Sequence, residues 1–149
     1  MAGAGTIASY CIEDLTVGQS ASYSRTISAR DVDLFGEVSG DMNPLHFDEE
    51  YAKGTIFRGR IAHGMLSASF ISTVFGTKLP GAGSIFMSAT VRFKAPVRIG
   101  DAVTATVKVR EIDLAKRRVM FDVVCTVGDM AVIDGEAMLK VPTRGSQKG

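Results

Sequence analysis

The chain has 149 residues, of which 46% are hydrophobic, and its formal net charge is +1. A chain of this length can bury one compact core, so a single domain is expected. Acidic and basic residues are interspersed, which gives no electrostatic reason to expect a nucleic acid or an anionic membrane as partner. Small solutes are the expected ligands.

Three further features bear on the cellular compartment of the protein. Cys11 and Cys125 are far apart and show no metal-ligand spacing. Reduced thiols in a cytosolic protein fit this pattern better than a disulfide framework, although the residues alone leave a disulfide open. The longest charge-free run, residues 61–77, falls short of the roughly 20 strongly apolar residues of a membrane span. Because the N-terminus also lacks a secretory signal pattern, we expect a cytoplasmic protein.

In the first half of the chain, a strand is expected over residues 20–27. Ser28 then has the character of a helix N-cap, with Asp31 three residues later as an acidic version of the capping box. The short helix that follows is expected to end at Gly40, and another helical turn is expected over residues 49–53. A buried helix should run from residue 65 to about 77, because this stretch is apolar around most of its circumference. Gly76 is its expected C-cap.

The second half of the chain is predicted to form strands. Residues 85–98 alternate apolar and polar side chains, which predicts a half-buried strand. Further strands are expected over residues 102–111, 119–127 and 130–141 as an antiparallel meander. One buried helix with a sheet around it is an α+β layout. The ordered core should span about 10–142, with loose tails at 1–9 and 143–149.

The segment Ser-Gly-Asp-Met-Asn-Pro-Leu-His-Phe-Asp at residues 39–48 is the first candidate for chemistry. An extended chain would hold Asp41 and His46 roughly 16–18 Å apart, but Asn43-Pro44 bends the backbone and lets them converge. A carboxylate and an imidazole at one site can each hold or move a proton of one water molecule, as adding or removing water requires. The alternative is a plain turn in which Asp41 caps an amide and His46 is a half-buried side chain.

The second candidate is Arg-Ile-Ala-His-Gly-Met-Leu at residues 60–66, which leads into the expected buried helix. The first amides of a helix have no partner within it, and a glycine lets another group approach the Gly64 N–H closely. With the positive end of the helix dipole behind it, this amide can act as an oxyanion-hole donor to a thioester enolate. The alternative is a loop glycine that only admits the helix.

Together the two segments resemble the (R)-specific enoyl-CoA hydratases of the MaoC-like dehydratase family, which have the hot-dog fold. The resemblance also rests on Phe35, on Leu-Pro-Gly-Ala-Gly-Ser-Ile at residues 79–85 and on Val-Arg-Phe-Lys-Ala-Pro-Val-Arg-Ile-Gly-Asp at residues 91–101. It covers nearly all of the chain except the tails. It implies one hot-dog domain over residues 1–149, with an antiparallel sheet wrapped around a long central helix. Because hot-dog domains usually pair edge to edge, it also implies a homodimer or a higher homo-oligomer.

The resemblance further implies a hydro-lyase that adds water reversibly to trans-2-enoyl-CoA and forms (R)-3-hydroxyacyl-CoA without a metal or a redox cofactor. By this resemblance Asp41 and His46 are the catalytic pair, and the Gly64 amide donates to the thioester oxygen. Asn43, His63 and Ser72 are the expected substrate-binding residues. Asn43 would act by orienting the loop through side-chain hydrogen bonds, and Ser72 matches a helix serine that lies near the pocket in some members.

Five basic residues are candidate anchors for the phosphates of CoA: Arg58, Arg60, Arg92, Lys94 and Arg98. The alternative is a solvated strand face whose charges protect the sheet against aggregation.

Three rival functions stay open at this point. One is dehydration of a 3-hydroxyacyl group on acyl carrier protein, which is the same chemistry run in reverse. Another is a hot-dog thioesterase. Such enzymes commonly need a carboxylate on or near the central helix, and residues 65–77 contain none, which disfavours this function. The third is a non-enzymatic module that binds acyl thioesters and needs no acid/base pair.

Overall fold

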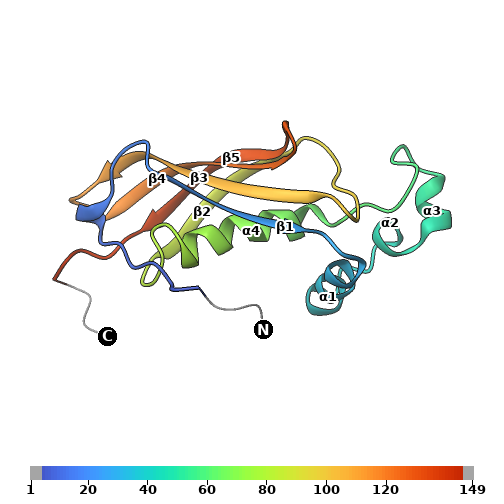
Figure 1. Ribbon diagram of the computed structural model, residues 1–149, viewed down its shortest axis with the longest axis horizontal. Coiled ribbons are helices and arrows are strands. Elements are labelled where there is room, and N and C mark those ends of the chain that lie inside the picture. Colours follow the sequence, from blue (N-terminus) through green and yellow to red (C-terminus); the bar gives the residue numbers. More distant parts are fainter. Residues whose placement is uncertain (1–4, 146–149) are drawn as a thin grey trace.

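The computed structural model describes residues 5–145 of the chain. Its main elements are one sheet, one long helix and three short helices (Figure 1). No helix within residues 5–145 is long and apolar enough to cross a membrane. In chain order the elements are the 3-10 turn η1 (Ile12–Asp14), β1 (Ser20–Thr26), α1 (Ala29–Ser39), α2 (Pro44–Phe47), α3 (Glu49–Lys53), α4 (Gly64–Thr77), β2 (Ile85–Phe93), β3 (Ala102–Asp113), β4 (Arg118–Val127) and β5 (Met130–Lys140).

The sheet has five strands in the order β1-β3-β4-β5-β2, and every neighbouring pair is antiparallel. Helix α4 runs along one face of it, while α1, α2 and α3 lie beyond one end of the sheet (Figure 1). This is the predicted α+β arrangement of a sheet around one central helix. The meander is confirmed for β3, β4 and β5, but β2 lies on the far side of β5, away from β3.

The core lies between α4 and the concave face of the sheet. In β3 the side chains at alternate positions are buried and their neighbours are not, as the strand period requires. The apolar side of α4 meets them with Phe70, Ile71, Val74 and Phe75. Cys11 and Cys125 are both free and buried, and the Sγ–H of Cys125 donates to the carbonyl of Ser67 on α4.

Strand β2 corrects the prediction of a half-buried strand. Its nine residues are exposed except for Val91, which is partly buried. The physical reason is its place at the edge of the sheet, where β5 is its only strand neighbour and α4 lies mainly under β3. Its apolar side chains therefore lie on the surface of the single chain, among them Ile85, Phe86, Met87 and Phe93.

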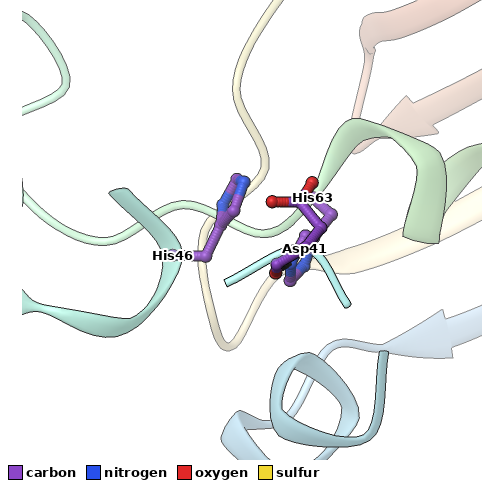
Figure 2. A group of neighbouring side chains, drawn as sticks. All are labelled: Asp41, His46 and His63. Carbon is purple, nitrogen blue, oxygen red and sulfur yellow. Dashed lines mark hydrogen bonds between the residues drawn. The ribbon is translucent and has the colours of Figure 1, made fainter. Parts of the chain in front are cut away.

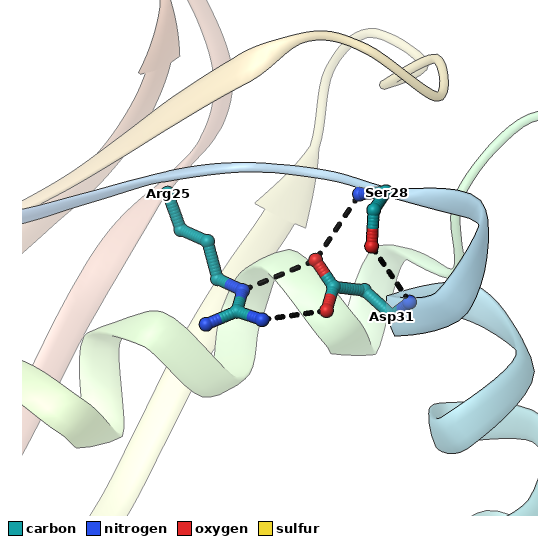
Figure 3. Close-up of polar contacts among 3 residues, drawn as sticks. All are labelled: Arg25, Ser28 and Asp31. Atoms are coloured by element: carbon teal, nitrogen blue, oxygen red, sulfur yellow. Dashed lines mark hydrogen bonds and ion pairs between the residues drawn. The ribbon is translucent and has the colours of Figure 1, made fainter. Parts of the chain in front are cut away.

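The predicted capping box at the start of α1 is confirmed. The Ser28 hydroxyl accepts from the Asp31 amide at 3.0 Å, and the Asp31 carboxylate accepts from the Ser28 amide at 3.1 Å. Arg25 at the end of β1 donates twice to the same carboxylate (Figure 3). This ion pair lowers the pKa of Asp31. Helix α1 ends at Gly40 in the left-handed conformation, as predicted, so both ends of the helix that precedes Asp41 are defined by local hydrogen bonds.

The end of α4 differs from its prediction. Gly76 lies within the helix, and the C-cap is Lys78. The amides of Lys78 and Leu79 both donate to the carbonyl of Val74, so one shared acceptor closes the helix without a glycine.

Parts of the expected loose tails are held by backbone hydrogen bonds. Ala8 bonds to Thr77 and Ala82, and the Arg144 amide donates to Glu13. Gly81 lies so close to this segment that a Cβ there would come within 1.9 Å of the Ala8 oxygen. The outer parts of both tails, residues 1–4 and 146–149, lie outside the described residues.

Candidate active site

The three groups expected to carry the chemistry line one cavity. Asp41 lies in the loop after α1, His46 on α2, and Gly64 is the first residue of α4. The cavity has a volume of about 440 Å³ and is lined by all three. Figure 2 shows the side chains of Asp41, His46 and His63 gathered from these three segments. The bend between residues 41 and 46 therefore brings together two groups that an extended chain would hold apart.

The bend itself is a one-turn helix. Asn43 is its N-cap, with the side-chain oxygen accepting from the Leu45 amide at 3.1 Å, and Pro44 stands in the first helical turn. The Asp41 carboxylate accepts from the Asn43 amide at 3.2 Å, so the plain capping role considered for Asp41 is also present. Asn43 is not among the residues that line the cavity. Its observed contacts shape the loop.

The ring of His46 is oriented by a neighbouring backbone carbonyl. Its Nδ1 lies 2.8 Å from the oxygen of Ile61, and because a carbonyl only accepts, Nδ1 carries the proton. The other ring nitrogen, Nε2, is then a bare acceptor. Burial lowers the pKa of His46 below its ordinary value of 6.5, although the bond to Ile61 opposes this shift. His46 therefore favours the neutral form, in which it can accept a proton.

The segment that supplies this carbonyl is itself fixed on two sides. The Ile61 amide donates to the carbonyl of Leu45 in α2, and the Ala62 amide donates to that of Val97 at 2.7 Å. Arg60 donates from Nε to the backbone oxygen of His46 at 2.6 Å. Nothing in the sequence pattern singled out Ile61, because its contribution comes from the main chain and would be the same for other residue types.

Asp41 is exposed, in contrast to the buried His46. A carboxylate oxygen of Asp41 and a ring nitrogen of His46 lie within 4.8 Å of each other, and within residues 5–145 no hydrogen bond joins the two side chains directly. A water molecule that donates one O–H to each of two acceptors holds them roughly 4.5 Å apart. A separation within this limit allows Asp41 and His46 to act as two acceptors of one water.

Gly64 presents an unused amide to the same cavity. As the first residue of α4 it has no acceptor within the helix, and none is found elsewhere among residues 5–145. A Cβ at this position would lie 2.7 Å from two ring carbons of Phe93. The glycine therefore allows the Phe93 ring to pack closely against the start of α4, and Phe93 is a neighbour that the sequence did not reveal.

The other two expected substrate-binding residues lie differently. Ser72 is exposed on α4 and is not among the cavity-lining residues, so its substrate contact stays a prediction. Ser67, which was not predicted, does line the cavity, and its hydroxyl is buried without a hydrogen-bond partner in the described part of the chain. Its spacing of three from Gly64 was the available signal, because residues three apart share a helix face. His63 lines the cavity but is buried.

Asp41, His46 and His63 together offer one carboxylate and two imidazoles, the residue types of many metal sites. However, the two imidazole rings are stacked, with centroids 3.9 Å apart and planes at 30°. A metal ion lies in the plane of each imidazole that binds it, and stacked rings direct their lone pairs side by side. This arrangement favours a hydrogen-bonded small molecule over a metal ion.

Four of the five basic candidate anchors have partners within the protein. Arg92 and Lys94 both pair with Asp134, Arg98 donates to the carbonyl of Phe57, and Arg60 donates to His46 as described above. Arg58 is exposed with φ of +58°. Arg92, near the end of β2, thus fits the alternative of a charged sheet surface, whereas Lys94 follows β2 and lines the cavity. Contact of the five basic residues with CoA stays a prediction.

Comparisons with known proteins agree with this architecture. Residues 15–129 match the family described as MaoC like domain. An (R)-specific enoyl-CoA hydratase from Rhodospirillum rubrum is 55% identical over 89% of this chain and 92% of its own length. A 3-hydroxybutyryl-CoA dehydratase from Methylorubrum extorquens is 48% identical over 89% of this chain and 84% of its own length. More distantly, a mitochondrial 3-hydroxyacyl-[acyl-carrier-protein] dehydratase from Arabidopsis thaliana is 36% identical over 86% of this chain and 78% of its own length.

Among solved structures, the unliganded R-hydratase from Pseudomonas aeruginosa superimposes with a TM-score of 0.84 at 43% identity. The match covers 90% of this chain and 86% of that one. The hot-dog fold implied by the sequence resemblance is thereby confirmed. From the family match and the identity along most of its length, the chain belongs to the MaoC-like family.

Proposed function

We propose that this protein is a hydro-lyase that catalyses the reversible hydration of trans-2-enoyl-CoA to (R)-3-hydroxyacyl-CoA. The observation that carries the proposal is the shared cavity, in which Asp41, His46 and the free amide of Gly64 meet. Most of the other lining side chains are apolar, among them Phe57, Ile133 and Val97, and suit an acyl chain. The names of two similar relatives, the hydratase from Rhodospirillum rubrum and the dehydratase from Methylorubrum extorquens, support the same reaction.

The amide of Gly64 activates the substrate. When the thioester oxygen accepts this N–H, electron density is drawn away from C3 of the conjugated acyl group, where water adds. Negative charge then develops on the oxygen, next to a donor already in position and at the positive end of α4. The binding energy of this contact increases as the enolate forms, so it lowers the barrier.

Asp41 and His46 hold the attacking water. Each accepts one of its O–H groups, which leaves a lone pair of the water oxygen directed at C3. As the O–C3 bond forms, one of the two side chains takes a proton, and a proton is returned to C2. Because Asp41 and His46 lie in one cluster, we expect hydroxyl and proton to add to the same face of the double bond. The scheme uses no metal or redox cofactor.

The first test is a spectrophotometric hydration assay over enoyl-CoA chain lengths, followed by chiral analysis of the product. We expect loss of enoyl absorbance with crotonyl-CoA and formation of the (R)-3-hydroxyacyl thioester. An unchanged spectrum across all chain lengths would contradict the proposal, as would an (S) product. Release of free thiol instead would identify a thioesterase, and binding without turnover would identify an acyl-thioester module.

Dehydration on acyl carrier protein is the second candidate function, and the related plant enzyme favours it. The same acyl group presented on CoA and on acyl carrier protein separates the two functions. We expect a higher kcat/KM with the CoA ester. A preference for the carrier-bound substrate would assign the protein to the second function.

We also propose that the chain forms a homodimer through β2 and acts in the cytoplasm. The outer edge of β2 has unpaired backbone groups, and its exposed side chains include Phe86 and Met87. Such an edge is a template for pairing with another copy. Analytical ultracentrifugation should give a molecular mass twice that of the chain. In the Met87→Lys variant the measured mass should shift toward that of the monomer. A monomeric wild-type protein would contradict the dimer without affecting the catalytic proposal.

A further inference from the structure

His63 contacts each of the functional groups around it in a different way. Its Nε2 lies 3.0 Å from the backbone oxygen of Asp41, and its ring stacks on His46 at a centroid distance of 3.9 Å. It is also the N-cap of α4, so its own peptide bond contains the amide of Gly64. The side chain is 2% exposed. One buried residue therefore contacts the loop that carries Asp41, the ring of His46 and the first residue of α4. Figure 2 shows it beside Asp41 and His46.

The proton positions on this ring follow from its partners. A carbonyl oxygen only accepts, so the nitrogen that faces Asp41 must carry the proton. The other nitrogen, Nδ1, is buried and has no hydrogen-bond partner among residues 5–145. A proton there would place an unpaired N–H and a positive charge in a buried site beside the stacked ring of His46, which is unfavourable. In the neutral ring the one N–H is therefore on Nε2 and is directed at the main chain.

This geometry is unsuited to the substrate contact expected for His63 from the sequence. The only N–H is occupied by Asp41, and Nδ1 is shielded from solvent. The ring is also in contact with aromatic side chains from two helices. Phe35 of α1 lies at a centroid distance of 4.8 Å and Phe47 of α2 at 5.5 Å. The ring thus fills the space between α1, α2 and the start of α4.

We propose that His63 is a positioning residue for the hydration reaction. It holds the main chain of Asp41 by a hydrogen bond and the imidazole of His46 by stacking, so that both face the Gly64 amide across the cavity. The expected effect on kcat rests on the proposed function. The tautomer assigned to His63 does not, because it follows from the hydrogen bond to Asp41.

Two substitutions separate the hydrogen bond from the ring. His63→Phe keeps an aromatic ring between Phe35 and His46 but removes the donor to Asp41. His63→Gln keeps an amide nitrogen at the same number of bonds from Cα as Nε2 but removes the ring. A small misplacement of reacting groups can lower a rate on the order of 10²-fold, so we expect His63→Phe to lower kcat by about this factor with little change in KM. His63→Gln should recover part of that loss.

A rise in KM with unchanged kcat in His63→Phe would overturn the proposal in favour of a substrate contact. Full kcat in His63→Phe would also overturn it, because the Asp41 contact would then be dispensable. Circular dichroism and thermal unfolding of each variant identify any loss of fold.

A measurement on the wild-type protein keeps the inference testable if the variants do not fold. Nitrogen-15 histidine NMR should show that Nε2 of His63 carries the proton and that Nδ1 does not, as the bond to the Asp41 carbonyl requires. An Nδ1–H tautomer would overturn the inference. Absence of hydration with the expected tautomer would instead refute only the proposed function.

Discussion

The Nδ1–H of His46 donates to the carbonyl oxygen of Ile61 across 2.8 Å. This bond links α2 to the segment that precedes α4, and it sets the tautomer of the proposed base. With Nδ1 occupied, Nε2 is the nitrogen available to accept a proton. The main chain therefore determines which atom of His46 can take part in chemistry.

The pH dependence of the reaction should reflect this environment. Burial lowers the pKa of His46 below 6.5, and protonation would remove the acceptor that the scheme requires. We therefore expect kcat/KM for crotonyl-CoA to be kept as the pH falls to 6.5 and to decline only at lower pH. An acid limb above pH 6.5, in protein shown by circular dichroism to be folded, would contradict this assignment.

Asp41→Asn should abolish one of the two proton acceptors while keeping the size of the side chain. General acid–base catalysis contributes typically about 10²–10⁴-fold, so we expect kcat to fall within this range and the unfolding temperature to change little. Asp33→Asn is the matched control, since Asp33 is exposed on α1 and outside the cavity. Equal activity of the two variants would show that the Asp41 carboxylate is not required.

Gly64→Ala should lower kcat/KM because the new methyl group meets the ring of Phe93 beside the proposed oxyanion donor. Phe93 is 53% exposed and can move, so the cost in unfolding free energy should be near the lower end of the range for overpacking, about 1 kcal/mol. Adding Phe93→Ala should restore part of the activity.

Gly76→Ala on the same helix is the control for this pair, since nothing lies within 4 Å of the added methyl group. It should raise the unfolding temperature slightly, because alanine favours the helix over glycine. Full activity of Gly64→Ala would indicate that close approach to the amide is unimportant.

Asp31→Asn tests the connection between β1 and α1. Removing the ion pair with Arg25, which is half exposed, should cost about 1 kcal/mol of unfolding free energy. The folded-state pKa of Asp31 is lowered from 3.8. The ionised Asp31 carboxylate therefore contributes to the free energy of unfolding above pH 3.8. This contribution is lost as the pH falls below that value and through the folded-state pKa. Chemical unfolding of wild-type protein should show this loss, and Asp31→Asn should lack it. Identical acid dependence of the two would contradict the assignment.

Features that depend on neighbours a few residues apart could be predicted from the sequence. The capping box of Ser28 and Asp31, the end of α1 at Gly40 and the bend at Asn43-Pro44 each involve hydrogen bonds or backbone preferences within about four residues. Such contacts form in the same way wherever the segment lies. The candidate residues Asp41, His46 and Gly64 were therefore found from local spacing and from family resemblance.

Which of the remaining side chains are buried, and what they contact, depends on long-range packing that no local pattern specifies. The alternation in β2 predicts a buried face, but its position at the sheet edge exposes it, and no local pattern specifies strand order. Likewise, Ser67 lines the cavity while Ser72 of the same helix is exposed, because the side of α4 that packs on the sheet is set by distant strands. The contacts of His63 with Asp41 and His46 join residues 22 and 17 positions apart in the sequence, so they exist only once α1, α2 and α4 have packed together.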